Sequence, residues 1–152
     1  MKSLLEPPAQ DASSRAMTRS VHGQLDMGLN MKSEYLAAVR GIVREHLRLW
    51  EVGDEASERM LIAVNELLTN VCQHTDPDQS GWQMVSLLVQ RVPGGITAIV
   101  SDRDVRVPVQ VVPAQLAENG RGWRLVRDLV DDVSVSVTGA GKDVWVYVGE
   151  TT

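Results

Sequence analysis

The 152-residue sequence contains no phenylalanine and a single cysteine, Cys72. One cysteine excludes an internal disulfide, and it also excludes a zinc site built from several thiolates. Because Cys72 lies within an apolar helical pattern, we interpret it as a small core residue rather than a reactive thiol.

Positive charge and long apolar runs are also scarce. Lysine and arginine together number 15 against 20 acidic residues, which gives a net charge of −5 and a pI near 5.1. A nucleic-acid binder that relies on bulk positive charge is therefore excluded. The first ten residues, MKSLLEPPAQ, contain no apolar signal core, and no apolar run is long enough to span a membrane. We expect a cytoplasmic protein that contacts neither a membrane nor nucleic acid directly.

The chain length suits one well-packed domain. Residues 1–19 mix prolines with polar residues and show neither helical nor strand periodicity, so we expect a flexible N-terminal arm. Residues 20–152 are then the folded domain. Alternating apolar residues over 21–28 predict its first strand.

The rest of the chain separates into helical and strand patterns. Apolar residues at helical spacing predict helices over 33–50, 52–75 and 122–132. Runs rich in β-branched residues, interrupted by glycine turns, predict hairpins over 82–102 and 133–149. This order favours an α+β fold, a two-layer sandwich with helices on one face of a mixed, largely antiparallel sheet.

A stripe of polar residues interrupts the second helix, in the stretch AVNELLTNVCQHT. Glu66, Asn70 and His74 follow one another at intervals of four residues and so share one narrow face of the helix. An E-x-x-x-N pair alone is more often a solvated helix face than a functional site. The neighbours Ile62 and Leu67 are apolar, however, so other segments must decide between the two interpretations.

Two later segments carry further candidate residues. Asp102 ends the strand AIVSD, where a carboxylate can accept hydrogen bonds from an exocyclic amine. Gly120 and Gly122 precede a helical pattern, and glycines at a helix start let backbone N–H groups approach an anion closely. Taken singly, the aspartate is at least as well explained as a turn residue, and the glycines as a tight loop.

Taken in order, these motifs resemble the ATP-binding domain of the GHKL superfamily, and among its members the stand-alone anti-sigma-factor serine kinases. The segment LIAVNELLTNVCQHT resembles the N box, and IVSD resembles the start of the first glycine box. GRGWRLV resembles the second glycine box, and GKDVWVYV resembles the last. The likeness covers residues 20–150 and implies the Bergerat-type form of the sandwich.

The resemblance implies a role for each candidate residue. Asn70 would bind Mg²⁺ with its hard amide oxygen. Glu66, one turn away, would act as general base, and Asp102 would recognise the adenine amino group. A lid formed by Gly120, Arg121 and Gly122 would surround the phosphates of ATP. His74 would be a helix cap or a phosphate neighbour.

Two boxes depart from the family pattern. Arg103 follows Asp102 where glycines are usual, and Lys142 and Asp143 stand where the last box usually has threonine. A carboxylate from Asp143 near Asp102 would repel it unless Lys142 or an arginine compensates.

Two functions therefore remain open. The first is an ATP-binding anti-sigma regulatory factor that sequesters a sigma factor and phosphorylates a serine of an anti-sigma-factor antagonist. The second is a catalytically inactive partner-switching module with a degenerate nucleotide site. For either function, a homodimer formed through apolar residues on the first helix is possible.

Overall fold

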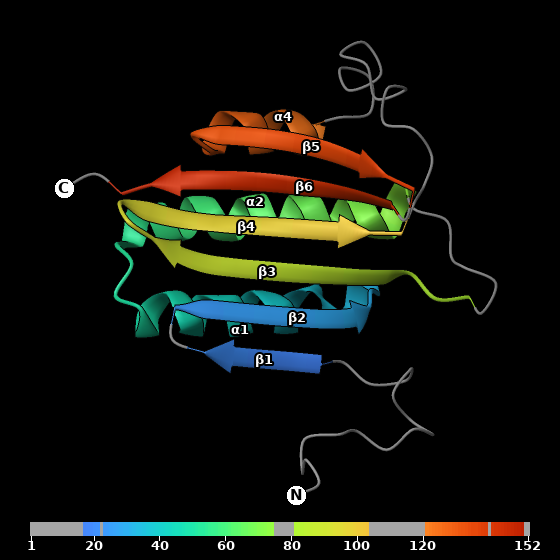
Figure 1. The fold of residues 1–152 in the computed structure, drawn as a ribbon, viewed down its shortest axis with the longest axis horizontal. Helices are drawn as coiled ribbons and strands as arrows, with labels where there is room; N and C mark the ends of the chain where they lie inside the picture. The colour runs from blue at the N-terminus through green and yellow to red at the C-terminus, as the bar shows by residue number, and fades with distance from the viewer. Residues whose placement is uncertain (1–16, 22, 75–80, 104–120, 140, 151–152) are drawn as a thin grey trace, which may run out of the picture.

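One sheet and one layer of helices make up the computed structural model of the protein (Figure 1). The structure describes residues 17–21, 23–74, 81–103, 121–139 and 141–150. The strands are β1 (Met17–Val21), β2 (Gln24–Asn30), β3 (Met84–Val92), β4 (Gly95–Asp102), β5 (Asp132–Thr138) and β6 (Gly141–Gly149). The helices are α1 (Leu36–Leu49), α2 (Asp54–His74) and α4 (Arg121–Leu129), and a 3₁₀ turn, Ser33–Tyr35, precedes α1.

The predicted α+β sandwich is confirmed. The strand order is β1-β2-β3-β4-β6-β5. We predicted a mixed, largely antiparallel sheet. All pairs between the described strands are antiparallel, so the sheet they form is not mixed. The last strand, β6, returns between β4 and β5 and so runs opposite to both neighbours.

The first strand prediction was incomplete. The pattern over 21–28 is a hairpin of two strands, because the chain reverses between β1 and β2, where Gly23 has a φ of 74°. Glycine adopts this left-handed conformation without steric cost. Residues 17–19, which we expected in the arm, belong to β1, and residues 1–16 lie outside the described part of the chain.

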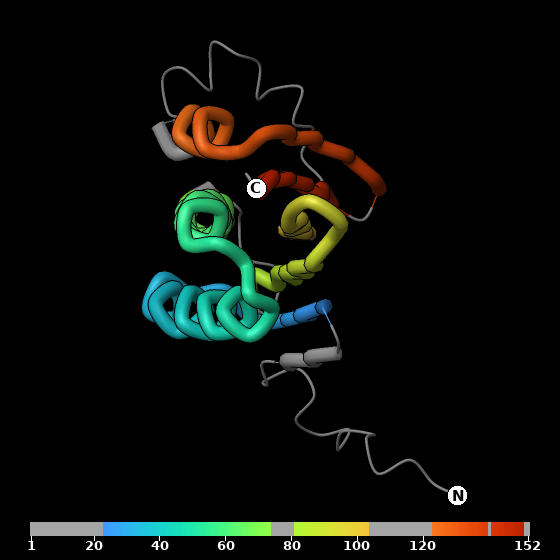
Figure 2. Tube along the Cα trace, turned by 90° about the vertical axis from the view of Figure 1, so that its left-hand side faces the viewer, coloured from blue at the N-terminus to red at the C-terminus, as the bar shows by residue number. Residues whose placement is uncertain are grey.

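The helices cover one face of the sheet, and Figure 2 shows the two layers edge-on. Alternate strand residues point into the space between the layers, among them Leu25, Leu87 and Val146, each 0% exposed. The helices contribute Val43 and Met60, also 0% exposed, at helical spacing. Cys72 packs at the margin of this core, and burial raises the pKa of its thiol, as expected for a structural cysteine.

The opposite face of the sheet has no helix over it in the described part of the chain (Figure 2). It carries half-buried residues of the other parity, including Leu88, Ile99 and Trp145, which are cross-strand neighbours. We call the two sides the helix face and the open face. Any two consecutive strand residues belong to different faces, which decides the geometry of the candidate site.

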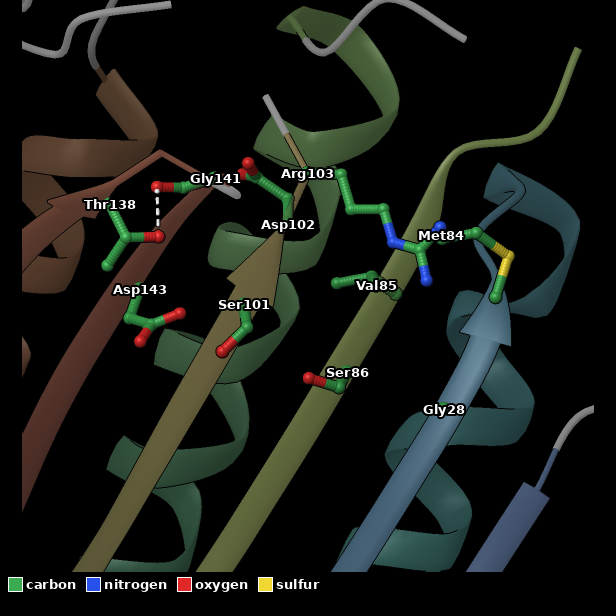
Figure 3. A pocket seen from close by; sticks show the side chains of 10 residues that line it. All are labelled: Gly28, Met84, Val85, Ser86, Ser101, Asp102, Arg103, Thr138, Gly141 and Asp143. Atoms are coloured by element: carbon green, nitrogen blue, oxygen red, sulfur yellow. Dashed lines mark hydrogen bonds between the residues drawn. The ribbon is translucent and has the colours of Figure 1, made fainter. Parts of the chain in front are cut away.

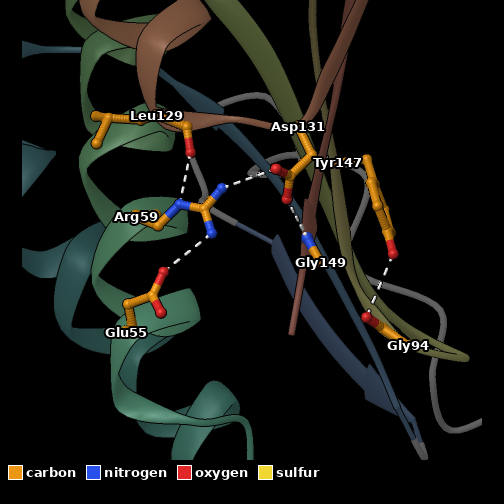
Figure 4. Close-up of polar contacts among 7 residues, drawn as sticks. All are labelled: Glu55, Arg59, Gly94, Leu129, Asp131, Tyr147 and Gly149. Atoms are coloured by element: carbon orange, nitrogen blue, oxygen red, sulfur yellow. Dashed lines mark hydrogen bonds and ion pairs between the residues drawn. The ribbon is translucent and has the colours of Figure 1, made fainter. Parts of the chain in front are cut away.

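A polar network joins the end of α4 to α2 and β6 (Figure 4). Arg59 Nε donates to the carbonyl of Leu129 at 2.8 Å, and its Nη2 lies 3.1 Å from Asp131 Oδ1. The other oxygen of Asp131 accepts the backbone N–H of Gly149 at 2.6 Å. The network ties the first turns of α2 to the C-terminal end of α4.

We expect two carboxyl groups at this end of the sheet to make the fold sensitive to acid. The backbone N–H of Gly149, then Arg59, lowers the pKa of Asp131. Likewise the backbone N–H of Gly53, then Arg91, lowers the pKa of Glu150. In the unfolded chain both groups take up protons near their ordinary values, about 3.9 and 4.3. The unfolded state therefore binds more protons in acid, and stability is lost as the pH falls through the folded pKa values.

We expect the free energy of unfolding, measured by urea titration, to decrease as the pH is lowered below about 4.5. Replacing both acids by their amides, Asp131→Asn with Glu150→Gln, should flatten this decrease. An unchanged pH dependence in the double variant would show that other groups cause the acid sensitivity.

Candidate functional site

Three structural elements begin or end toward the same end of the molecule. Strand β4 ends at Asp102, α2 ends at His74, and α4 begins at Arg121 at this same end (Figure 1). These are the elements that carry the residues singled out from the sequence. The fold therefore gathers the N box, the end of the first glycine box and the start of the α4 helix.

The polar stripe lies on the flank of α2 that faces α4. Arg59 marks this flank, because it hydrogen bonds to Leu129 at the end of α4. With about 100° between successive residues, positions 66 and 70 fall within about 20° of position 59 around the helix axis. Glu66 and Asn70 therefore point along the side of α2 nearest α4, and both are half-buried.

The other flank of α2 faces α1. There Asn65 Oδ1 accepts a hydrogen bond from Arg40 of α1 at 2.9 Å. Asn65 and Asn70 thus have different surroundings, since one has a structural partner on α1 and the other lies toward α4. His74 is the last residue of α2. Its side chain lies outside the described part of the structure.

Asp102 is a largely buried carboxylate on the helix face of the sheet. Its side chain is 3% exposed, and its Oδ2 lies 3.3 Å from Nζ of Lys142, which is 24% exposed. The two residues are direct cross-strand partners on β4 and β6. A carboxylate at this depth needs such a partner, because an unpaired charge away from water is costly.

Gly141 allows β6 to pass close to Asp102. Its φ is 150°, and a Cβ at this position would lie 1.9 Å from the carbonyl oxygen of Asp102 and 2.9 Å from Cα of Arg103. Only a residue without a side chain fits here. The glycine thus fixes the backbone that carries the carboxylate, and it places Lys142 next to it.

Repulsion between Asp102 and Asp143 was expected unless a lysine or arginine compensates, and Lys142 pairs with Asp102. Asp143 follows Lys142 directly, so its side chain projects from the open face, where its cross-strand partner is Ser101. Asp143, Ser101 and Ser86 line a cavity of about 360 Å³ at this edge of the sheet, and Asp102 and Arg103 also contribute to its lining (Figure 3). Lys142 alone of the two residues lies beside Asp102, and it supplies the compensating charge.

The second glycine box lies partly within α4. The helix begins at Arg121, one residue before the predicted start at 122, so the backbone of Arg121 and Gly122 belongs to its first turn. The helix also ends at Leu129 instead of residue 132, because β5 starts at Asp132. The side chains of Arg121 and Gly122, and all of Gly120, lie outside the described part of the structure.

The donor set for a cation is sparse in the described residues. No group of three His, Cys, Asp or Glu side chains able to hold a metal ion occurs among them. Asn70 and Glu66 offer hard oxygen ligands one turn apart, which fits Mg²⁺ that takes its remaining ligands from water and nucleotide phosphates.

Sequence reasoning missed the Arg59 network and left the partner of Asp102 open. The spacing of Glu55 and Arg59 in the sequence predicts an i,i+4 ion pair, and the structure has this pair at 3.1 Å. The bonds of Arg59 to Leu129 and Asp131 depend on tertiary contacts. The strand parity of Lys142 was visible too, but its register against β4 was not.

Comparison with known proteins bears on the fold of residues 29–148 as a whole. Residues 29–148 match the model of the histidine kinase-like ATPase domain family. No curated protein sequence is significantly similar to the chain. Among the described residues, no helix has the length and apolar character needed to cross a membrane.

Two solved structures share the fold. The RsbU and RsbW domains of a Mycobacterium tuberculosis protein superpose with a TM-score of 0.60 at 13% identity, covering 82% of this chain and 32% of that one. The histidine kinase domain of a blue-light activated histidine kinase from Erythrobacter litoralis gives 0.53 at 22% identity, covering 75% and 60%. The chain thus spans about a third and three fifths of these two proteins.

Proposed function

The chain belongs to the family of histidine kinase-like ATPase domains, and on this premise we propose that it is an ATP-binding anti-sigma regulatory factor. It holds a sigma factor away from RNA polymerase and phosphorylates a serine of an anti-sigma-factor antagonist. The observation that carries the proposal is the position of the buried carboxylate of Asp102 at the end of the molecule where α2 ends and α4 begins.

Different residues bind different parts of the nucleotide. Asp102 accepts a hydrogen bond from the exocyclic amine of adenine. Asn70 would hold Mg²⁺, which would supply positive charge to the phosphates. The start of α4, with Arg121 and Gly122, presents backbone N–H groups and the positive end of the helix dipole to the phosphates. We assign Gly120 and His74 to phosphate binding as well.

Glu66 assists the acceptor serine. Its carboxylate lies one turn before Asn70 on the same flank of α2, where it can take the hydroxyl proton as the phosphoryl group is transferred. Catalysis of this kind depends mainly on positioning and charge compensation, so these few groups suffice.

Phosphoryl transfer provides the test. With [γ-³²P]ATP, Mg²⁺ and a cognate antagonist, we expect labelled phosphoserine from the wild-type protein. Glu66→Gln should lower the rate of transfer by about 10²-fold or more while ATP binding persists. Saturated ATP binding without any transfer to the antagonist would rule out the kinase function.

A second candidate is the non-catalytic partner-switching module. The altered boxes favour it, since Arg103 and Lys142 stand near Asp102 in place of the residues expected from the family. In that case, Glu66→Ala and Asn70→Ala would leave partner affinity unchanged, and the purified protein would bind no nucleotide.

The partners follow from the same proposal. They are a sigma factor and an anti-sigma-factor antagonist in the cytoplasm, without direct contact to nucleic acid. On α1, Leu49 is 72% exposed, which provides an apolar contact for a partner or for a second copy of the chain.

A further inference from the structure

The ion pair between Asp102 and Lys142 presents two opposite hydrogen-bonding groups at one point. The carboxylate only accepts hydrogen bonds, and the ammonium only donates them. Their charged atoms lie 3.3 Å apart, so a flat ligand edge can contact both at once. Neither the family likeness nor the role given to Asp102 above assigns a function to Lys142.

Exposure makes Lys142 the first of the two groups that a ligand meets. Its side chain is 24% exposed, whereas that of Asp102 is 3% exposed. A lysine ammonium carries three N–H groups on a flexible stem, more than the ion pair uses. A base that hydrogen bonds to the carboxylate therefore lies within reach of a donor.

Purine bases offer matching edges in two orders. Adenine has an amino donor at position 6 beside the N1 acceptor, and a 6-oxopurine has the O6 acceptor beside the N1–H donor. An aspartate beside a lysine satisfies either order, because the donor and the acceptor on the base simply exchange partners. When the ribose and phosphates hold the base in one register, a carboxylate alone accepts a hydrogen bond from the amino group of adenine but repels O6 of a 6-oxopurine, so O6 needs the donor that Lys142 supplies.

We propose that Lys142 is a specificity-determining residue that lets the site accept 6-oxopurine nucleotides as well as ATP. The inference rests on the proposed nucleotide function, and it concerns the base rather than the phosphates. Gly141 supports it, because the close approach of its backbone to Asp102 holds Lys142 beside the carboxylate.

The test compares inosine triphosphate with ATP, since these two nucleotides differ at the ring edge and share the same ribose and phosphates. Calorimetric titration in the presence of Mg²⁺ should give affinities within about tenfold of each other for the wild-type protein. Lys142→Met removes the donor and keeps the stem length. This substitution should lower the affinity for inosine triphosphate by a factor at least ten times larger than the factor by which it lowers the affinity for ATP. Lys142→Arg, which keeps the charge, should bind inosine triphosphate about as tightly as the wild-type protein does.

The adjacent Asp143→Asn is the matched control, because Asp143 projects from the open face and should leave both affinities unchanged. If wild-type protein prefers ATP by more than about a hundredfold, the inference is wrong and the proposed ATP binding stands. An equal loss of both nucleotides in Lys142→Met would also overturn it, since Lys142 would then act only as a structural partner.

If the proposed nucleotide function is wrong, neither nucleotide will bind to the wild-type protein. That result would rule out both the nucleotide function and the role of Lys142. Circular dichroism and thermal melting establish that each variant is folded. If Lys142→Met does not fold, the wild-type ratio and Lys142→Arg still decide the question.

Discussion

Gly141→Ala is expected to destabilise the protein by about 3 kcal/mol and to abolish nucleotide binding. The added Cβ would meet the carbonyl oxygen of Asp102 at 1.9 Å. No rotamer change relieves this distance, because the oxygen is a backbone atom and the backbone fixes the position of Cβ. The φ of 150° is also a conformation that an alanine rarely adopts. Steric overlap and backbone strain each cost about 1–3 kcal/mol in such positions.

The chain must relieve the clash by separating β6 from the end of β4. That movement shifts Asp102 and breaks its ion pair with Lys142, so the base site is lost together with stability. Thermal melting should show a midpoint lowered by about 10 °C for a domain of this size. Titration with Mg-ATP at a temperature where the variant remains folded should show no saturable binding.

Gly139→Ala is the matched control. This glycine belongs to the same turn between β5 and β6, but a Cβ there would meet no atom within 4 Å. We expect a change in stability of no more than about 0.5 kcal/mol and unchanged nucleotide affinity. Equal stability of the two alanine variants would mean that β6 does not approach Asp102 as closely as the structure shows.

Periodicity in the sequence was sufficient to predict most of the fold. The two long helices and both hairpins follow from apolar spacing, since each element buries one face against the other layer. Strand β1 was missed because its sequence, MTRSV, has little apolar alternation and lies at the edge of the sheet. The insertion of β6 between β4 and β5 is a choice of nonlocal partner, which local patterns do not encode.

The candidate site shows the same division between local and nonlocal information. Helical spacing placed Glu66 and Asn70 on one face of α2, and strand alternation placed Lys142 and Asp143 on different faces of β6. Deciding which of these two residues lies beside Asp102 required the register between β4 and β6. The sequence alone therefore left charge repulsion open at a position where the structure has an ion pair.

Loss of magnesium-dependent ATP binding in Asn70→Ala and in Asp102→Asn is the second large effect that we expect. Asn70→Ala removes a hard oxygen ligand, so the added affinity that Mg²⁺ gives to ATP should disappear. Asp102→Asn keeps the shape of the side chain and removes its charge. The acceptor for the adenine amine is weakened, and Lys142 loses its ionic partner. Hydrogen bonds to charged groups are worth about 1.5–3 kcal/mol, so each variant should lose about 10- to 100-fold in affinity.

Calorimetric titration with ATP, with and without Mg²⁺, measures both losses. Each variant has a control that makes the same kind of chemical change elsewhere. Asn65→Ala lies on the flank of α2 that faces α1, where it removes only the bond to Arg40. Asp143→Asn lies on the open face, one residue from Lys142. Both controls should bind ATP as the wild-type protein does.

The pattern across these four variants separates the two functions. If Asn70→Ala and Asp102→Asn lose binding while both controls retain it, the flank of α2 nearest α4 and the end of β4 form one nucleotide site. Serine phosphorylation of an antagonist is then the next measurement. If wild-type protein fails to bind ATP at millimolar concentration, Arg103 and Lys142 have closed the base site to nucleotide. The half-buried Glu66 and Asn70 would then belong to the surface of a switch that acts by binding proteins alone.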